Sequence, residues 1–349
     1  MSIFKKDLIA MDIGSYSAKV VSLSGSPGAW AVDGAAYFKL PKQEAGNATV
    51  SNGFLTGLVS AQRLSGKSIA ALMTGRSLIF RHLYMPPMPD NDLKEAVKWE
   101  LKKEGAIAGD YVSDYCQAGK SARPGENMLS VIAFAADRSE AEAVMTLYKN
   151  AGLKIRVLDT VPTALLFSFD AHEEWQDKVN YAMLDVGQFK STLVILRDKK
   201  LVFVREIAFG GEDITKAVAD GMKKELEEAE ELKFAAAVEV KPFEADAGEA
   251  SHFIKFALER LCSEVHRSLD YYQAQFRGGA VSKLFLCGGT AQIPGIEGFV
   301  AESLGIPSFV NDPFRGFKMR AAMEAQRIKP IAASLTAATG MAVRLHWKE

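Results

Sequence analysis

Two short motifs of one kind stand about half the chain apart. Each is an Asp-x-Gly turn between two apolar runs: residues 12–15 read Asp-Ile-Gly-Ser, and residues 185–188 read Asp-Val-Gly-Gln. Glycine lets a backbone approach a ligand closely, so amide N–H groups can point at phosphate oxygens, and a neighbouring carboxylate can hold Mg²⁺ through water. The repeat, 173 residues apart (185 minus 12), indicates two related halves that each open with a β-hairpin.

A third glycine motif lies further along the chain, where Gly288, Gly289 and Thr290 follow a strand-like run. Together with the two Asp-x-Gly turns, it predicts a nucleotide site in a cleft between the halves. The alternative is that these glycines only form tight turns, and that Asp12 and Asp185 only cap hairpins.

Short apolar and β-branched runs alternate with helical stripes along the chain. The expected strands cover residues 8–13, 18–23, 69–73, 128–134, 181–186, 192–196, 201–207 and 283–287. Apolar residues at helical spacing predict helices over residues 93–101, 141–148 and 254–269, with Asp90 or Asn91 as the N-cap of the first. This alternation is typical of an α/β protein.

The composition excludes several classes of protein. The chain has 349 residues, of which 48% are hydrophobic, and its 42 Lys plus Arg balance 43 Asp plus Glu. This excludes intrinsic disorder and gives no overall field that would gather nucleic acid or an anionic membrane. No apolar run approaches the roughly 18 to 20 residues that cross a bilayer, and no signal peptide is recognised, so a cytoplasmic location is expected. The three cysteines and five histidines lack the spacing of a disulfide framework or a metal site.

Around these motifs the chain resembles the actin-like ATPase superfamily and, within it, the type IV pilus assembly PilM family, which is related to the division protein FtsA. The similar segments are residues 12–21 (first phosphate motif), 185–187 (second phosphate motif), 207–215 (the Gly-Gly segment after it), 229–233 (the helix that borders ribose and adenine) and 288–289 (adenosine motif). Two further segments, residues 93–100 and 267–272, resemble PilM sequences in particular. The resemblance runs over most of the chain.

The resemblance implies an actin-like, ribonuclease H-like fold, which is an α/β fold of two lobes with duplicated halves and inserted subdomains. The first lobe is expected at residues 1–180, with its core at 1–88 and 156–180 and an FtsA-like inserted subdomain at 89–155. The second lobe is expected at residues 181–349, with its core at 181–212 and 276–349 and an inserted helical subdomain at 213–275.

The resemblance also implies a site for ATP or ADP with Mg²⁺. The nucleotide-binding residues are expected to be Asp12, Gly14, Ser15, Tyr16, Lys19, Asp185, Gly187, Gln188, Gly210, Gly211, Glu230, Lys233, Gly288, Gly289 and Thr290. Lys19 stands where such proteins place a phosphate-facing lysine, and Asp12 and Asp185 are expected to hold Mg²⁺ through water. The alternatives are that Lys19 is a surface lysine, and that Glu230 and Lys233 form an ordinary solvated ion pair on a helix.

Three positions depart from the family's pattern. Val161 precedes Pro162 where many actin-like proteins have a Glu that positions the attacking water, and valine can neither accept a proton nor orient water. Phe189 follows the second turn where the family has small residues, and Thr290 replaces a further glycine. We therefore expect ATP binding with weak or absent hydrolysis, and no catalytic residue is assigned.

The predicted function is a cytoplasmic nucleotide-binding scaffold, peripheral to the inner membrane, in the type IV pilus assembly platform. The resemblance implies that a groove of the first lobe binds the cytoplasmic N-terminal tail of a PilN-like bitopic protein, and residues 79–84 and 111–115 are candidate strands for that groove. Other platform or motor proteins are further expected partners, the membrane is reached only through partners, and nucleic acid is not expected. The alternatives are an active ATPase or a small-molecule kinase on the same fold, and FtsA-like filaments.

Overall fold

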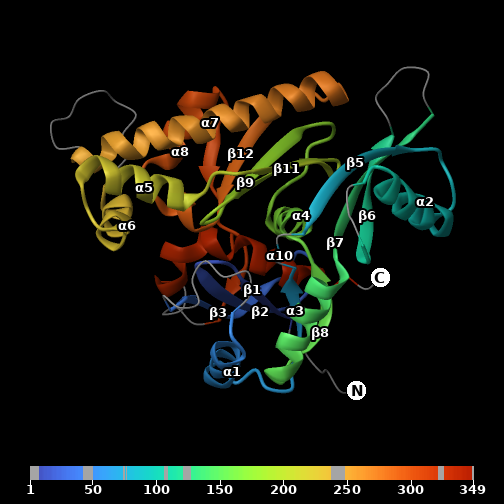
Figure 1. Ribbon diagram of the computed structural model, residues 1–349, viewed down its shortest axis with the longest axis horizontal. Coiled ribbons are helices and arrows are strands. Elements are labelled where there is room, and N and C mark those ends of the chain that lie inside the picture. The colour runs from blue at the N-terminus through green and yellow to red at the C-terminus, as the bar shows by residue number, and fades with distance from the viewer. Residues whose placement is uncertain are drawn as a thin grey trace.

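Two central sheets form the middle of the molecule, and Figure 1 shows the second sheet above the first. The computed structural model describes residues 8–41, 50–73, 75, 77–105, 109–120, 127–236, 248–320 and 326–347. The first sheet has the order β14-β3-β2-β1-β4-β8, with β1 (Leu8–Ile13), β2 (Ser17–Ser24), β3 (Ala31–Lys39), β4 (Ser68–Leu72), β8 (Lys154–Asp159) and β14 (Lys318–Met319). The second has the order β11-β10-β9-β12-β13, with β9 (Asn180–Val186), β10 (Ser191–Arg197), β11 (Lys200–Ile207), β12 (Val281–Cys287) and β13 (Ser308–Val310).

The two sheets repeat one topology. In the first, the antiparallel meander β1-β2-β3 is extended beside β1 by the parallel strands β4 and β8. In the second, the meander β9-β10-β11 is extended beside β9 by the parallel strands β12 and β13. An Asp-x-Gly turn joins the first two strands of each meander. This repeat confirms the predicted α/β fold with duplicated halves.

Two helices lie between the sheets. α4 (Val161–His172) packs on β10 and β11, α10 (Thr336–Arg344) packs on β1, β2 and β4, and the two helices pack on each other. A Cβ atom at Gly340 would lie 1.8 Å from the carbonyl oxygen of Ala164, so the crossing requires glycine. The halves therefore meet through a sheet-helix-helix-sheet stack.

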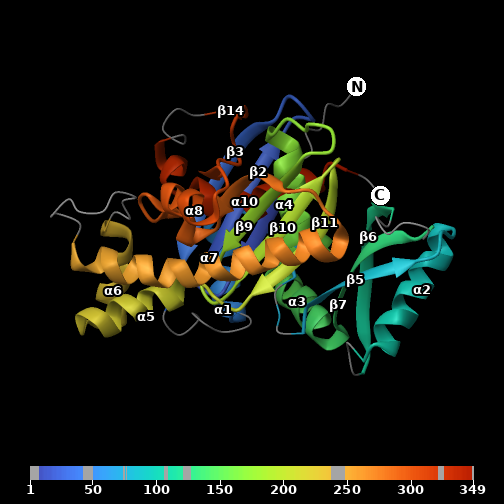
Figure 2. The same ribbon diagram turned by 90° about the horizontal axis from the view of Figure 1, so that it is seen from above.

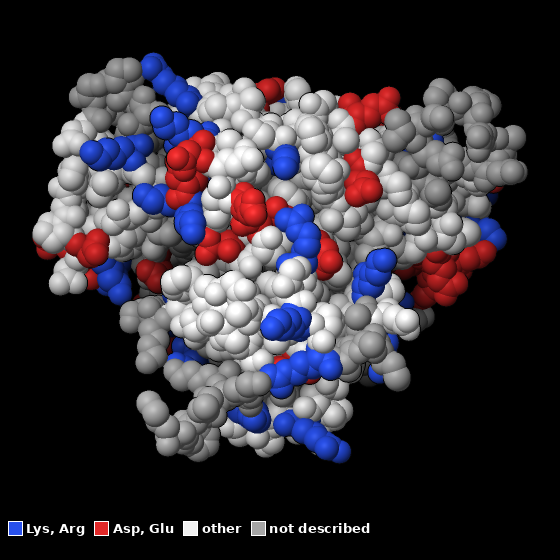
Figure 3. Space-filling model, turned by 180° about the vertical axis from the view of Figure 1, so that it is seen from behind, with Lys and Arg blue, Asp and Glu red and all other residues white. Residues whose placement is uncertain are grey.

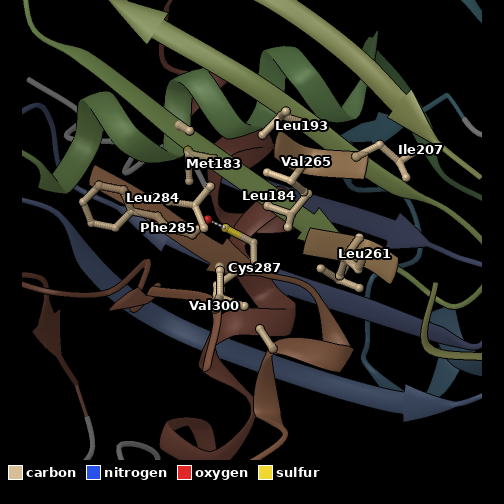
Figure 4. Packing of buried hydrophobic residues seen from close by; sticks show 14 of the residues in the cluster. Met183, Leu184, Leu193, Ile207, Leu261, Val265, Leu284, Phe285, Cys287 and Val300 are labelled. Carbon is tan, nitrogen blue, oxygen red and sulfur yellow. Dashed lines mark hydrogen bonds between the residues drawn. The ribbon is translucent and has the colours of Figure 1, made fainter. Parts of the chain in front are cut away.

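Other helices cover the outer faces of the sheets. α1 (Asn52–Ala61) and α3 (Arg138–Asn150) cover the first sheet. The second is covered by α7 (Glu249–Phe276) and α8 (Ile296–Leu304), and α5 (Gly211–Met222) and α6 (Leu226–Ala235) pack against α7. Figure 4 shows Leu261 and Val265 of α7 next to Leu184 of β9, within the largest buried apolar cluster. Two short 3₁₀ helices, η1 (Gly289–Gln292) and η2 (Lys329–Leu335), complete the second half.

A third, smaller sheet stands to one side of the central pair (Figure 2). It consists of the antiparallel strands β5 (Ile79–Met85), β7 (Leu129–Asp137) and β6 (Tyr111–Lys120), in the order β5-β7-β6. α2 (Asp90–Lys103) packs against this sheet through Leu93, Val97 and Leu101. β6 also contacts β11 of the second central sheet, so the small sheet touches both halves.

The predicted bounds of the two lobes and of the two insertions remain untested predictions. β5 begins before residue 89 and pairs with β7 in the third sheet. β14 and α10 follow residue 276 and pack on the first sheet. We propose on this basis that the first insertion begins at β5, and that the C-terminal residues contribute to both halves.

The strands and helices that were predicted from local patterns are all present in the structure. Each of the eight predicted strands and three predicted helices corresponds to a strand or helix of the structure. The predicted N-cap of α2 is wrong, because Pro89 precedes the helix and no side chain caps it. The Asp90 carboxylate instead accepts a hydrogen bond of 3.2 Å from Gln117 Nε2 of β6. The sequence also predicts an exposed turn at residues 119–125 and a loop at residues 241–248, and most of both segments lies outside the described residues.

Charges of both signs share the molecular surface. Figure 3 shows Lys and Arg interspersed with Asp and Glu over the upper part of one face. Ion pairs between neighbouring turns of one helix include Lys216–Glu212 on α5 and Lys224–Glu228 near the start of α6. Within the described ranges, no helix is both long and apolar enough to span a membrane.

Candidate functional site

A cavity of about 870 Å³ lies where the two Asp-x-Gly turns approach each other. Twelve of the fifteen predicted nucleotide-binding residues line it, namely Asp12, Gly14, Ser15, Tyr16, Lys19, Asp185, Gly187, Gln188, Glu230, Lys233, Gly289 and Thr290. The remaining three, Gly210, Gly211 and Gly288, contact these residues from behind. The repeated fold thus brings together residues from both halves, which are far apart in the sequence.

The first turn holds a buried ion pair. β1 and β2 place Asp12 directly opposite Lys19, and Lys19 Nζ lies 3.0 Å from Asp12 Oδ2. The Gly14 N–H closes the turn by donating to the Ser17 carbonyl at 3.0 Å. Burial by itself lowers the pKa of Lys19, but the Asp12 carboxylate outweighs burial and the pKa is raised. Lys19 is therefore a fixed cation at the cavity, and its interpretation as a surface lysine is wrong.

The second turn is closed by the same backbone hydrogen bond as the first. The Gly187 N–H donates to the Lys190 carbonyl at 3.1 Å, and Asp185 lies opposite Thr192 on β10. Burial, then the negative charge of Asp12, raises the pKa of Asp185 to about 6, although Lys19 opposes this. Two carboxylates thus face one lysine, which leaves an excess of negative charge that a divalent cation would offset.

Glycines allow three segments to pack closely around Asp185. A Cβ at Gly210 would lie 2.4 Å from the Gln188 carbonyl oxygen, and Gly288, at φ +84°, comes near Asp185. The Gly211 N–H at the start of α5 donates to the Gly187 carbonyl at 2.8 Å. Gly210 and Gly211 therefore support the second turn from behind, and their amides have partners within the protein.

Lys233 of α6 is buried in the cavity wall. Its side chain is 1% exposed, and Nζ donates to Glu230 Oε2 at 2.6 Å, Thr215 Oγ1 at 2.9 Å and the Gly211 carbonyl at 3.2 Å. Burial lowers the pKa of Lys233, and Glu230 counteracts this effect. The interpretation of this pair as solvated is wrong, because the fold of α5 onto α6 covers it.

Sequence reasoning missed part of the lining. Tyr37 and Lys39 reach the cavity from β3, and Lys39 Nζ lies 5.1 Å from the ring centroid of Tyr16. Because β3 is only partly buried at nearly all of its positions, its sequence lacks the apolar run that marks the other strands. Val161, Phe189 and Thr290 also line the cavity, so all three departures from the family's pattern face the site itself.

A second cavity, of about 790 Å³, lies between β6 and the junction of β8 with α4. Residues 112–116 of β6 line one side, and residues 156–160 line the other. β6 and β8 are each the last strand of their sheet on this side. Arg344 pairs with Asp159 at 3.4 Å within the cavity, and burial raises the pKa of Asp159. We call this cavity the groove.

Residues 10–346 match the model of the family described as type IV pilus assembly protein PilM. The chain belongs to the PilM family. Since the match covers nearly the whole chain, the resemblance inferred from a few motifs is confirmed. The family assignment rests on more than the glycine turns, which many nucleotide-binding folds share.

Known relatives agree with this family and with its fold. A solved structure titled "PilM-PilN type IV pilus biogenesis complex" has a TM-score of 0.81 at 24% identity, covering 96% of this chain and 97% of that chain. MreB5 of Spiroplasma citri bound to ADP has a TM-score of 0.51 at 11% identity, covering 95% of this chain and 94% of that chain. The cell division protein FtsA of Enterococcus hirae is 26% identical over 177 residues, and the match spans 45% of this chain and 39% of that relative. The fold is thus the actin-like ATPase fold.

Proposed function

We propose that this member of the PilM family is a nucleotide-binding scaffold of the type IV pilus assembly platform that holds a peptide of a PilN-like membrane protein in the groove. The observation that carries the proposal is the coexistence of two separate sites. One is built around both Asp-x-Gly turns and carries charged side chains from both halves, and the other is a groove between two edge strands. The first suits a nucleotide and the second suits an extended chain.

The nucleotide is ATP or ADP, held with Mg²⁺. Asp12 and Asp185 are the residues that would hold Mg²⁺ through water, since their buried pair carries more negative charge than Lys19 offsets. In the described part of the chain, no three His, Cys, Asp or Glu side chains are grouped to bind a metal directly, which agrees with water and phosphate as the other ligands. Bound Mg²⁺ would neutralise phosphate charge, while Lys19 contributes a fixed cation. The ADP complex of the actin-like relative MreB5 supports this choice of ligand.

Hydrolysis is expected to be weak or absent. Val161 lines the cavity at the start of α4, and its side chain can neither accept a proton nor orient a water. An active ATPase or small-molecule kinase is the alternative, with Asp185 as its candidate base, because a pKa of about 6 suits proton transfer near neutral pH. Sustained phosphate release by the purified protein would favour that alternative.

The peptide is the cytoplasmic N-terminal tail of a PilN-like bitopic protein. An extended chain can add its main-chain hydrogen bonds to an edge strand, and β6 and β8 both present an edge at the groove. Apolar lining residues such as Phe134, Leu158 and Phe167 would accept its side chains. The likeness to a PilM protein solved with PilN supports this partner. Capture of this tail would keep the protein cytoplasmic and peripheral to the inner membrane.

A binding titration tests the proposal. A fluorescein-labelled synthetic peptide of the first residues of a PilN protein should bind the purified chain with saturable anisotropy, and Mg-ATP should raise the melting temperature. Thr163→Trp should block the peptide, because Thr163 lines the groove from α4. Thr146→Trp, on the exposed face of α3, is the matched control and should bind normally. Absence of peptide binding with and without Mg-ATP would refute the scaffold function.

A further inference from the structure

One end of the first half carries exposed basic side chains. They come from the segment after α1, the end of α3 and the edge strand β8, and they are Arg63, Lys149, Lys154 and Arg156. Within the described part of the chain, none of the four forms an ion pair. We call these four residues the basic face. Figure 3 shows Lys and Arg, with little Asp or Glu among them, over the lower part of the molecule, where the first half lies.

Two neighbouring loops hold the basic face together. One joins α1 to β4, and the other joins α3 to β8. The Gly66 N–H donates to the Gly152 carbonyl at 2.8 Å, and the Lys154 N–H donates to the Lys67 carbonyl at 3.0 Å. Arg63 has a φ of +55°, so the chain places a long cationic side chain where the backbone favours glycine. The fold therefore gathers charges from segments that are distant in the sequence.

The sequence around the basic face is poor in acidic residues. Residues 45–89 contain no Asp or Glu, and neither do residues 143–158, although the whole chain has 43 such residues. Met145 of α3 is 52% exposed and lies one helical turn before Lys149, so an apolar side chain reaches solvent beside the basic ones. A partner with negative charges above an apolar layer would match both features, and a lipid bilayer has this structure.

The basic face borders the groove. Arg156 belongs to both, because it lines the groove from β8. Lys154 precedes it by two residues, about 7 Å along a strand. The peptide proposed for the groove is the tail of a bitopic protein, so the bilayer that holds the rest of that protein lies within the tail's reach. An occupied groove therefore brings a lipid surface close to the basic face.

We propose that the basic face binds an anionic lipid surface, so that the protein is held at the bilayer by two contacts, one in the groove and one at the basic face. The choice of a lipid partner rests on the proposed function, but lipid binding itself requires no peptide. Each basic residue near an anionic leaflet raises affinity about fivefold. Four of them give weak, reversible binding. Once the groove holds the tail, the lipid contact becomes intramolecular and strengthens the whole attachment.

Co-sedimentation with vesicles tests the proposal without any peptide. The purified chain should sediment with vesicles of phosphatidylglycerol and phosphatidylcholine in equal parts, and remain in solution with vesicles of phosphatidylcholine alone. Raising the salt concentration should release it, because salt screens exposed charges. Absence of binding to the anionic vesicles, or equal binding to both kinds, would overturn the proposal. Failure of the labelled peptide to bind in solution would instead refute the function of the groove, and the vesicle result would stand.

A double variant tests whether the basic face carries the binding. Arg63→Gln with Lys149→Gln should weaken vesicle binding about 25-fold, at about fivefold for each charge removed. Peptide binding in solution should stay unchanged, because neither residue lines the groove.

The matched control is Lys200→Gln with Lys283→Gln, which removes the same net charge at exposed residues of the second half. The control should bind vesicles as the wild type does. An unchanged affinity in the first variant, or an equal loss in both variants, would overturn the role of the basic face. Binding to polyglutamate, with none to vesicles, would indicate an acidic protein partner and overturn the lipid assignment.

Discussion

Asp12 and Asp185 occupy equivalent places in two copies of one hairpin, but the residues opposite them differ. β2 presents Lys19 to Asp12, and β10 presents Thr192 to Asp185. Both turns are closed by the same hydrogen bond, from the glycine N–H to the carbonyl three residues on. The repeated backbone sets where the carboxylates lie, and the cross-strand residue sets their charge balance.

This difference makes the cavity asymmetric. The Asp12 carboxylate is neutralised by Lys19. The Asp185 carboxyl group, whose pKa is raised to about 6, has no lysine of its own opposite it. A symmetric site with two lysines would hold phosphate without a metal ion, whereas one lysine between two carboxylates requires a further cation. The asymmetry therefore favours a nucleotide bound together with Mg²⁺.

The largest expected effect comes from removing the paired carboxylate. Asp12→Ala should abolish the rise in melting temperature that Mg-ATP produces, which in the wild type corresponds to about 2.7 kcal/mol at 100 times the dissociation constant. The loss is expected because Lys19 remains buried without its partner and one of the two carboxylates proposed to hold Mg²⁺ through water is missing. Asp220→Ala, on the exposed face of α5, is the control and should keep the full shift. An unchanged shift in Asp12→Ala would place the nucleotide elsewhere.

A pH titration separates the two carboxylates. Because folding raises the pKa of Asp185 from about 3.9 to about 6, the native state binds more protons than the unfolded state between about pH 4 and pH 6. The free energy of unfolding should therefore fall as pH rises through this window, by about 2 to 3 kcal/mol in total. In the Asp185→Asn variant, the free energy of unfolding should not fall over this pH window. It is measured by denaturant unfolding in the presence of EDTA. Parallel pH curves for the variant and the wild type would contradict the raised pKa.

A lysine at the cross-strand position of the second hairpin tests whether this position sets the charge balance. Thr192→Lys places a cation opposite Asp185, and Thr192 borders the cavity, which gives the longer side chain room. The pKa of Asp185 should fall by about 1 unit or more, as measured by carbon-13 NMR of its carboxyl group. ATP binding should then depend less on Mg²⁺. Thr192→Val adds no charge and should leave both properties near those of the wild type.

The smallest effect is expected at the lysine within the second turn. Lys190 pairs with Glu206 at the surface, and its side chain is half exposed. Lys190→Ala should change the free energy of unfolding by less than about 1 kcal/mol and ATP affinity by less than about threefold, because exposed pairs contribute little. Isothermal titration calorimetry measures the affinity. A tenfold loss would instead make Lys190 the counterpart of Lys19 in the second hairpin.

The sequence predicts those features that depend on neighbouring residues. The spacing of apolar residues within a short segment indicates the strands and the amphipathic helices, and the two Asp-x-Gly turns can be recognised as a repeat. α4 was missed because it is packed between two sheets and lacks a polar face that would reveal a period. The burial of Lys233 depends on how α5 meets α6, and the pairing of β14 with β3 joins segments almost 300 residues apart. Such contacts leave no local pattern.

The crossing of α4 and α10 limits how the two halves can move. At Gly340 the helices touch backbone to backbone, with no side chain between them that could adopt another rotamer. Sliding one half along the other would drive the Gly340 backbone into the Ala164 carbonyl or open a void in the core. Rotation about this point keeps the contact. We therefore expect the crossing to act as a pivot, so that closure of the nucleotide cavity would turn one sheet over the other about an axis through Gly340.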